Sequence, residues 1–199
     1  MPDYTLENIA RDKGFKYICG VDEAGRGPLA GPVCAAAVIL PENLIIEGVN
    51  DSKKISEKKR EQLYDIITQK ALAWSVAFSS VDEIEQLNIL GATYLAMTRA
   101  VNGLKLSADY ALIDGNRIPP QIAVPVETVV KGDSKSFSIA AASILAKVTR
   151  DRLLIEYNEQ YPQYGFLQHK GYGTKAHIQA IKKYGPCDIH RPSFIKNFV

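Results

Sequence analysis

Three short apolar segments in this chain each lead into acidic residues, and this pattern limits the possible folds more than any other. The segments and their acids are residues 17–21 before Asp22 and Glu23, residues 110–113 before Asp114, and residues 126–130 before Asp133. Short apolar runs bounded by turn residues are typical of buried strands. In open α/β sheets, ligands bind at the carboxyl ends of the strands. If the three strands are neighbours, their carboxylates crowd one small volume.

The other patterns predict further strands that alternate with helices. Residues 33–40 are the longest apolar run, and they predict a strand beside the first one. The remaining predicted elements are helices at residues 56–70 with Ser56 as N-cap, 88–106, 138–157 and 175–184, a strand at 71–79, and an aromatic, glycine-rich loop at 161–174. No repeat, linker or low-complexity stretch interrupts them. We therefore predict one continuous α/β unit around a mixed sheet.

The sequence argues against a membrane protein, a secreted protein and a disulfide-stabilised one. The 33–40 run is far shorter than the roughly 20 residues that cross a bilayer. Residues 1–16 lack the apolar core of a secretory signal, so we expect a cytoplasmic protein. The 3 cysteines are odd in number and form no Cys-x-x-Cys pair, which predicts free thiols in a reducing compartment.

Charge is distributed unevenly along the chain. Residues 1–130 carry 13 Lys and Arg against 17 Asp and Glu, a net −4, whereas residues 131–199 carry 11 against 5, a net +6. A basic C-terminal region after an acidic body suits a protein that binds a polyanion with one part and metal ions with the other. A solvated, lysine-rich helix would explain the same charges.

Crowded carboxylates repel one another, and a divalent cation is the natural way to neutralise them. Oxygen ligands without His or Cys favour Mg²⁺ or Mn²⁺ over zinc. One difficulty is that side chains alternate along a strand, so Asp22 and Glu23 point to opposite faces. Either the strand breaks there, or Glu23 uses its backbone carbonyl or serves a second ion. Taken alone, Asp114 and Asp133 are also compatible with turn or cap positions.

A glycine-rich turn directly follows the acidic pair. The glycines of Gly25-Arg26-Gly27 let the backbone approach a ligand closely, and Arg26 adds a guanidinium for phosphate. A tight hairpin would use the same glycines. Asp151 lies on the apolar stripe of the predicted 138–157 helix, and for it we predict a paired, half-buried structural role.

Three further segments are candidates for contact with a nucleic-acid backbone. Two of them repeat an acid, hydroxyl and lysine theme suited to phosphate, although surface turns have the same composition. In the third, an aromatic ring suited to stacking on a sugar or base lies beside basic residues, although a tyrosine packed under a loop would look the same. The candidate residues are Lys53, Ser134, Lys135, His169, Lys170 and Tyr172.

At these positions the sequence resembles the bacterial type 2 ribonucleases H, the ribonuclease HII family. The resemblance rests on residues 20–33, which begin Gly-Val-Asp-Glu-Ala-Gly-Arg-Gly, on Asp-Ser-Lys-Lys at 51–54 and on Asp-Gly-Asn at 114–116. It continues through Lys-Gly-Asp-Ser-Lys at 131–135, residues 139–151 and residues 169–174. It covers about residues 17–194, in matching order.

The resemblance implies a ribonuclease H-like mixed five-stranded sheet flanked by helices. Residues 1–160 would be the catalytic core, and residues 161–199 a substrate-contacting loop with a basic, helical C-terminal region. The implied activity is endonucleolytic cleavage of RNA in RNA/DNA hybrids and incision on the 5′ side of single ribonucleotides in duplex DNA. The products would carry 3′-hydroxyl and 5′-phosphate ends.

The resemblance also assigns roles to individual residues. Asp22, Glu23, Asp114 and Asp133 would be catalytic and would hold Mg²⁺ or Mn²⁺ for two-metal hydrolysis. The glycine-rich turn would recognise the ribose 2′-hydroxyl through its backbone, and Tyr172 would pack on the next sugar. We expect a monomer that replication or repair proteins could recruit. The alternatives are another nuclease of the same superfamily, of the resolvase type, or a non-catalytic nucleic-acid-binding module.

Overall fold

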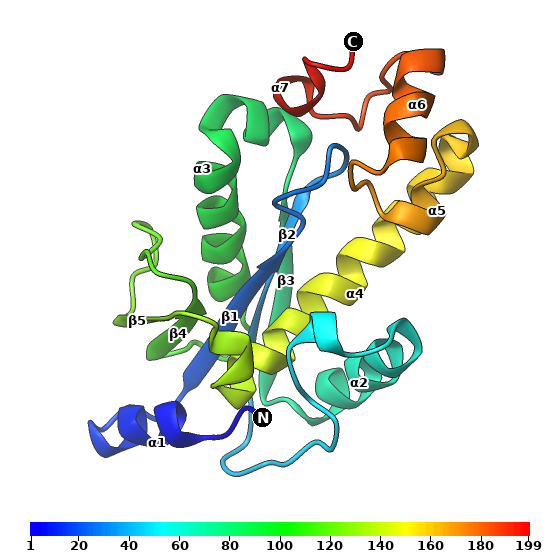
Figure 1. The fold of residues 1–199 in the computed structure, drawn as a ribbon. Coiled ribbons are helices and arrows are strands. Elements are labelled where there is room, and N and C mark those ends of the chain that lie inside the picture. The colour runs from blue at the N-terminus through cyan, green and yellow to red at the C-terminus, as the bar shows by residue number, and fades with distance from the viewer.

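A mixed five-stranded sheet forms the centre of the protein, and helices cover both of its faces (Figure 1). The computed structural model describes residues 1–199, except for the side chain of Lys54. The strands are β1 (Ile18–Ala24), β2 (Val33–Ile39), β3 (Ala73–Ser79), β4 (Tyr110–Asp114) and β5 (Val126–Val129). Their order in the sheet is β3-β2-β1-β4-β5, which confirms the predicted fold class.

The helices are α1 (Thr5–Asp12), α2 (Glu57–Lys70), α3 (Val81–Asn102), α4 (Phe137–Gln160), α5 (Phe166–His169), α6 (Lys175–Tyr184) and α7 (Pro192–Ile195). Short 3-10 turns occur at η1 (Ser52–Lys54), η2 (Gly132–Ser134) and η3 (Pro162–Tyr164). Helix α3 covers one face of the sheet, and α2 and α4 cover the other. No helix among the described residues is long and apolar enough to span a membrane.

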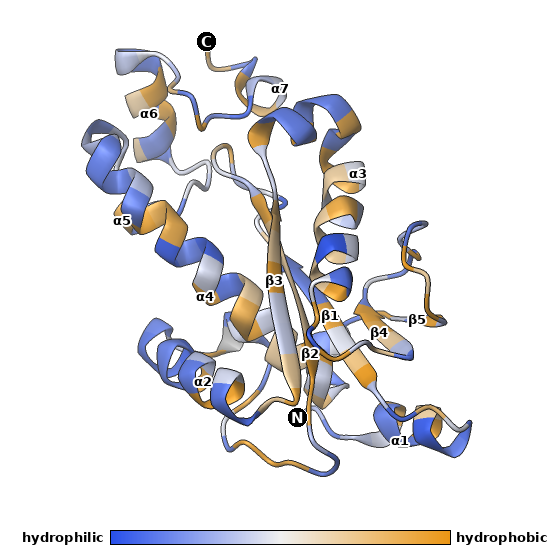
Figure 2. Ribbon diagram, turned by 180° about the vertical axis from the view of Figure 1, so that it is seen from behind, coloured by the Kyte–Doolittle hydropathy of each residue, from blue (hydrophilic) through white to orange (hydrophobic). Residues whose placement is uncertain are grey.

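Strand β2 shows how both faces of the sheet are buried. Ala35 and Ala37 belong to the apolar cluster under α3, whereas Cys34, Ala36 and Val38 belong to the cluster under α2 and α4. All seven residues of β2 are buried. A strand with both faces covered is a continuous apolar run, which is why residues 33–40 stand out in the sequence. Figure 2 shows the strands of the sheet between α3 on one side and α2 and α4 on the other.

The strands that carry the acids run parallel to one another. In the register of β1 and β4, Val21 pairs with Ile113, and in that of β4 and β5, Asp114 pairs with Val129. The carboxyl ends of β1, β4 and β5 therefore lie side by side, which is the condition under which their carboxylates crowd together. Gly20 allows α4 to cross β1 closely, because a Cβ at this position would lie 2.1 Å from the carbonyl carbon of Ser138.

The C-terminal region packs on the loop between β1 and β2. Leu29 and Ala30 from that loop share an apolar cluster with Phe166, Ile181 and Ile195. A backbone hydrogen bond from Leu29 N–H to the Gly171 carbonyl joins the same two regions. The glycine-rich turn at residues 25–27 and the aromatic loop at residues 161–174 are thus neighbours in space, although they are far apart in the sequence.

Several predicted elements differ from the structure. Helix α1 falls in a segment for which no element was predicted, and the predicted 161–174 loop contains η3 and α5. The helix predicted from residue 88 begins at Val81 and contains non-helical backbone at Asn88, with φ of 57°. Asn88 caps the second part, because its side chain accepts hydrogen bonds from the backbone of Leu90 and Gly91. The sequence pattern therefore revealed only the part after the kink.

Candidate active site

Four acidic side chains gather at the carboxyl ends of the three parallel strands. Asp22 lies in β1, Asp114 is the last residue of β4, and Asp133 lies in η2 directly after β5. Asp22 and Asp133 are buried, with 5% and 8% of their surface exposed. The Gly132 N–H donates a 2.7 Å hydrogen bond to Asp114 Oδ1, which ties the end of β4 to the turn that carries Asp133.

Strand β1 does not break at the acidic pair. Asp22 and Glu23 pair with Ala36 and Ala35 of β2 in regular antiparallel register. Val21 lies on the α3 side of the sheet, so Glu23 shares that side and Asp22 faces the α4 side. The regular pairing excludes a break in the strand at this point. What remains is that Glu23 uses its backbone carbonyl or serves a second ion.

The electrostatics of these acids are those of crowded, poorly solvated carboxylates. Burial raises the pKa of Asp22 well above its ordinary value, and the charges of Glu23 and Asp114 raise it further. Burial also raises the pKa of Glu23, although the nearby Arg26 opposes the shift. Mutual repulsion of this kind is found where a cation normally binds.

Asp133 also lies near Asp51, the acid of the Asp-Ser-Lys-Lys segment for which contact with phosphate was predicted. Burial raises the pKa of Asp133, and the charges of Asp51 and Asp114 add to the effect. Lys53 extends from the same η1 turn toward the acids. Burial lowers the pKa of Lys53, but Asp22, Asp133 and Asp51 outweigh this effect, and the net pKa is raised.

The described residues include no group of three or more His, Cys, Asp or Glu side chains already arranged to hold a metal ion. The chemistry of the donors nevertheless fits a hard divalent cation, because all are carboxylates, and burial together with neighbouring negative charge raises the pKa values of Asp22 and Asp133.

Two buried arginines, Arg150 and Arg191, hold the loop that contains the glycine-rich turn at residues 25–27. No sequence pattern indicated this role. The Arg191 guanidinium donates hydrogen bonds to the carbonyls of Gly25 (2.6 Å), Arg26 (3.0 Å), Pro28 (2.8 Å) and Gly31 (2.8 Å). Burial lowers its pKa to about 9. The Arg26 side chain itself is exposed and lies 3.4 Å from Glu23.

Arg150 performs the same task from α4. It donates to the carbonyls of Ala30 (3.0 Å), Pro32 (3.1 Å) and Lys170 (3.1 Å), so it joins the glycine-rich loop to the aromatic loop. Only 1% of Arg150 and 0% of Arg191 is exposed. The sequence gives no signal of such a role, because the partners are backbone carbonyls distant in the chain.

The aromatic loop presents Tyr172 to solvent, with 45% of the residue exposed, rather than packing it beneath the loop. The ring borders a cavity of about 210 Å³ that Glu23, Gly27 and Lys53 also line. A second cavity of about 340 Å³ lies beside it and is bordered by Glu23, Asp114 and residues of α3. Of the four acids, Glu23 therefore borders both cavities and Asp114 borders the larger one.

The basic residues of the aromatic loop are engaged within the protein. His169 Nε2 lies 2.8 Å from the Tyr164 carbonyl, and its Nδ1 accepts a hydrogen bond from Gly171 N–H. Lys170 Nζ donates to the Leu167 carbonyl and lies 3.5 Å from a Glu57 carboxylate. Their predicted contact with substrate stays a prediction.

The hydroxyl and lysine predicted after Asp133 lie at the edge of the site. Ser134 Oγ donates a 2.8 Å hydrogen bond to the Lys131 carbonyl, and the Lys135 side chain is exposed. Their contact with phosphate also stays a prediction.

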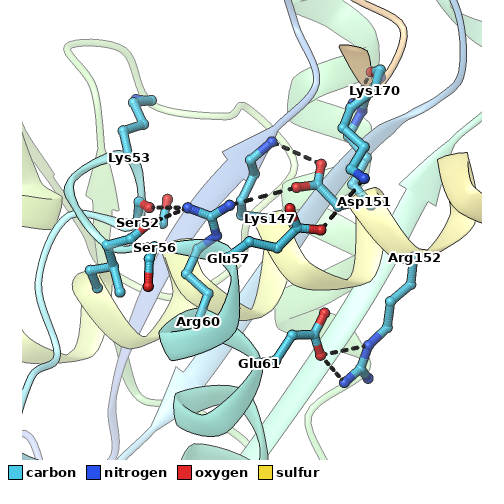
Figure 3. Close-up of polar contacts among 12 residues, drawn as sticks. Ser52, Lys53, Ser56, Glu57, Arg60, Glu61, Lys147, Asp151, Arg152 and Lys170 are labelled. Carbon is cyan, nitrogen blue, oxygen red and sulfur yellow. Dashed lines mark hydrogen bonds and ion pairs between the residues drawn. The ribbon is translucent and has the colours of Figure 1, made fainter. Parts of the chain in front are cut away.

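Asp151 is paired, as predicted, but it is buried rather than half-buried, and its partners are not its sequence neighbours. Lys147 Nζ lies 2.8 Å from Asp151, and Arg60 Nη2 lies 4.0 Å from it (Figure 3). Arg60 also donates to the Ser52 carbonyl of η1, and Lys147 Nζ lies 5.8 Å from the centre of the Tyr172 ring. Asp151 thus connects α2 and α4 behind the 210 Å³ cavity.

Comparison with known proteins gives a consistent result. Residues 19–197 match the family described as Ribonuclease HII. A ribonuclease HII from Ruminiclostridium cellulolyticum is 58% identical over 195 residues, which cover 98% of this chain and 76% of that protein. Another, from Clostridioides difficile, is 55% identical over 98% of this chain and 76% of that protein.

Among solved structures, the ribonuclease H2 of Pyrococcus horikoshii superimposes with a TM-score of 0.76 and 27% identity, covering 92% of this chain and 97% of that one. The ribonuclease HII of Archaeoglobus fulgidus, determined in complex with PCNA, gives a TM-score of 0.74 and 26% identity, covering 88% of this chain and 94% of that one.

Proposed function

Because this chain belongs to the ribonuclease HII family and is a ribonuclease H, we propose that it cuts the RNA strand of RNA/DNA hybrids and incises duplex DNA on the 5′ side of single ribonucleotides. The products carry 3′-hydroxyl and 5′-phosphate ends. One observation carries the proposal: acids from three neighbouring strands crowd together, and burial and mutual repulsion raise the pKa values of Asp22 and Asp133.

The proposed cofactor is Mg²⁺ or Mn²⁺, held by Asp22, Glu23, Asp114 and Asp133. Two such ions, when bound, supply activation of the attacking water and stabilisation of the leaving 3′-oxygen. The chain itself orients the Asp114 carboxylate through the 2.7 Å hydrogen bond from Gly132 N–H. Lys53 places a positive charge near the acids, where the reacting phosphate would gain negative charge.

Recognition of the ribose is assigned to the glycine-rich loop and Tyr172. The 2′-hydroxyl is the group that distinguishes RNA from DNA at one nucleotide. In support, Arg191 holds the carbonyls of Gly25 and Arg26, so the backbone at this turn is rigid. Tyr172 is exposed beside the same cavity, where its ring can pack on the following sugar.

The proposed partners are RNA/DNA hybrids and DNA duplexes that contain ribonucleotides, bound by a monomer in the cytoplasm. Recruitment by a replication or repair protein is also proposed, because the Archaeoglobus relative forms a complex with PCNA.

The test is a cleavage assay on four labelled duplexes: a continuous RNA/DNA hybrid, DNA with one ribonucleotide, all-DNA, and a four-way DNA junction. We expect Mg²⁺-dependent cutting of the first two, and loss of cutting in Asp114→Asn with hybrid binding retained. Cleavage of the junction would instead indicate a resolvase-type nuclease. Binding without cleavage would indicate a non-catalytic module.

A further inference from the structure

Two buried histidines connect the C-terminal region to the backbone of Tyr172. His177, in α6, is 0% exposed, and His190, just before α7, is 3% exposed. His177 Nδ1 lies 2.9 Å from the Tyr172 carbonyl oxygen, and His177 Nε2 lies 3.0 Å from His190 Nε2. The far nitrogen of the second ring, His190 Nδ1, accepts a 2.9 Å hydrogen bond from Cys187 N–H.

These contacts determine which nitrogen of each ring carries hydrogen. The Tyr172 carbonyl can only accept, so His177 Nδ1 must donate, and in a neutral ring its Nε2 then accepts. His190 Nε2 must therefore donate, which leaves His190 Nδ1 as an acceptor. The Cys187 N–H requires the same result from the other end of the chain. The Cys187 carbonyl lies farther from His190 Nδ1, at 3.3 Å, and would need the opposite tautomer.

The pair is suited to this arrangement only while both rings are neutral. Adding a proton to His177 Nε2 would bring two N–H groups face to face across 3.0 Å. Adding one to His190 Nδ1 would set it against the Cys187 N–H at 2.9 Å. Burial is the main cause that lowers the pKa of His177 to about 4, and burial also lowers the pKa of His190.

The titratable groups that surround the pair do not favour a charged ring. They are His169 from α5, stacked 4.3 Å from His177, with Tyr164 from η3 and Cys187 beside His190. Burial raises the pKa of the Tyr164 phenol and of the Cys187 thiol, so both are uncharged at neutral pH.

The chain of hydrogen bonds ends at the Tyr172 carbonyl, in a short segment that is held on both sides of Tyr172. Tyr172 N–H donates to the His169 carbonyl, and the Tyr172 carbonyl also accepts from Thr174 N–H at 2.8 Å. Gly171, with φ of 83°, lies against Ala30, because an added Cβ would meet the Ala30 carbonyl oxygen at 2.8 Å. A shift of the Tyr172 carbonyl would therefore move the exposed ring beside the cavity.

We propose that His177 and His190 are positioning residues that hold Tyr172 at the substrate sugar through this directed chain of hydrogen bonds. The inference rests on the proposed contact between Tyr172 and the sugar that follows the ribonucleotide. The histidines touch no substrate and act through the Tyr172 backbone.

The experiment compares two substitutions that place an amide nitrogen at different points of the imidazole. In His177→Asn the amide nitrogen lies near the position of Nδ1 and keeps the donor to Tyr172, whereas in His177→Gln it lies near Nε2 and removes that donor. The measured quantity is the ratio of kcat/KM for DNA with one ribonucleotide to kcat/KM for a continuous hybrid. We expect His177→Gln and Tyr172→Ala each to lower the ratio about tenfold. His177→Asn should keep it within about twofold.

A double variant tests whether His177 acts through Tyr172. In His177→Gln combined with Tyr172→Ala, the ratio should fall no further than in Tyr172→Ala alone. Additive losses, or equal losses in His177→Asn and His177→Gln, would overturn the inference and indicate a general packing role. If Tyr172→Ala lowers the ratio but His177→Gln does not, the inference fails while the proposed function stands. An unchanged ratio in Tyr172→Ala refutes the sugar contact itself.

Nitrogen-15 NMR of the unmodified protein provides a measurement that does not depend on the variants folding. At pH 7 we expect neutral rings, with hydrogen on Nδ1 of His177 and on Nε2 of His190. A charged ring, or the opposite tautomer at either residue, would contradict the directed chain.

Discussion

At the scale of single residues, Asp22 combines an expected benefit to catalysis with a cost in stability. Its pKa is raised in the folded protein by burial and by Glu23 and Asp114, so the folded state binds the proton more tightly than the unfolded chain does. Stability of the metal-free protein therefore falls as pH rises from the ordinary Asp range through the raised pKa. Above that raised pKa, the ionised carboxylate lowers the free energy of unfolding.

Asp22→Asn should consequently stabilise the metal-free protein while it removes activity. Asn keeps an oxygen for the 2.7 Å hydrogen bond from Glu23 N–H. We expect a gain of about 1–2 kcal/mol in EDTA at pH 7, a smaller gain near pH 4, and a loss of kcat of roughly a hundredfold or more. Thermal unfolding and the cleavage assay measure the two effects, with the exposed Asp65→Asn as control. A lower melting temperature at pH 7 would contradict the assignment of repulsion at Asp22.

A substitution at Arg191 can separate the effect of its positive charge from that of its hydrogen-bond geometry. Lysine keeps the positive charge, but one ammonium cannot replace a planar fork that binds four carbonyls. Arg191→Lys should lower stability by about 2–3 kcal/mol. It should also reduce kcat/KM on single-ribonucleotide DNA about tenfold, because the glycine-rich loop loosens. Urea unfolding and steady-state kinetics test this, and Arg152→Lys, at a surface ion pair with Glu61, should change neither by much.

At the scale of elements, α1 caps the longest helix of the protein. Glu7 is buried, and its Oε1 accepts hydrogen bonds from Ser138 N–H at 3.0 Å and from the Ser136 hydroxyl at 2.7 Å. A carboxylate at a helix N-terminus also interacts favourably with the helix dipole. Glu7→Ala should lower the free energy of unfolding by about 2–4 kcal/mol, because it leaves these donors buried without the carboxylate.

The denaturant midpoint of Glu7→Ala, measured with an unchanged slope, is the appropriate readout. Asp12→Asn at the exposed end of α1 is the control, and it should leave the midpoint within error. A midpoint for Glu7→Ala equal to that of the control would mean that α1 does not support α4.

Comparison of the predicted elements with those of the structure shows which features a single sequence can reveal. Burial makes β1, β2 and β4 apolar, and acids lie at or after the ends of β1, β4 and β5, so local patterns were enough to predict the strands. The crowding of Asp22, Asp114 and Asp133 also required these three strands to be neighbours, which only the structure shows. Helix α1 escaped prediction because its short amphipathic pattern lies in a polar segment. The roles of Arg150 and Arg191 escaped because carbonyl partners leave no mark on a side-chain pattern. Contacts between distant segments, unlike periodicity, cannot be seen in one sequence.

At the scale of the whole molecule, the separation of charge predicts where nucleic acid binds. The acids lie at the carboxyl ends of β1, β4 and β5, and the C-terminal region that packs on the β1–β2 loop, residues 161–199, carries 6 Lys and Arg against 1 Asp, a net +5. Each lysine that contacts a phosphate releases about 0.9 counterion. Binding to a hybrid should therefore weaken steeply with salt, and the slope of log K against log salt counts the contacts.

The α6 lysines allow this count to be tested. In the inactive Asp114→Asn background, a triple substitution by Gln at Lys175, Lys182 and Lys183 should make the slope shallower by up to about 2.7, the value for three lost contacts. The matched control removes the same charge at Lys13, Lys16 and Lys105. These lysines precede β1 and β4, so they lie toward the amino-terminal ends of the strands, opposite the acids. That control should change the affinity slightly and the slope hardly at all. Equal changes in the two triples would mean that net charge, rather than the position of α6, attracts the substrate.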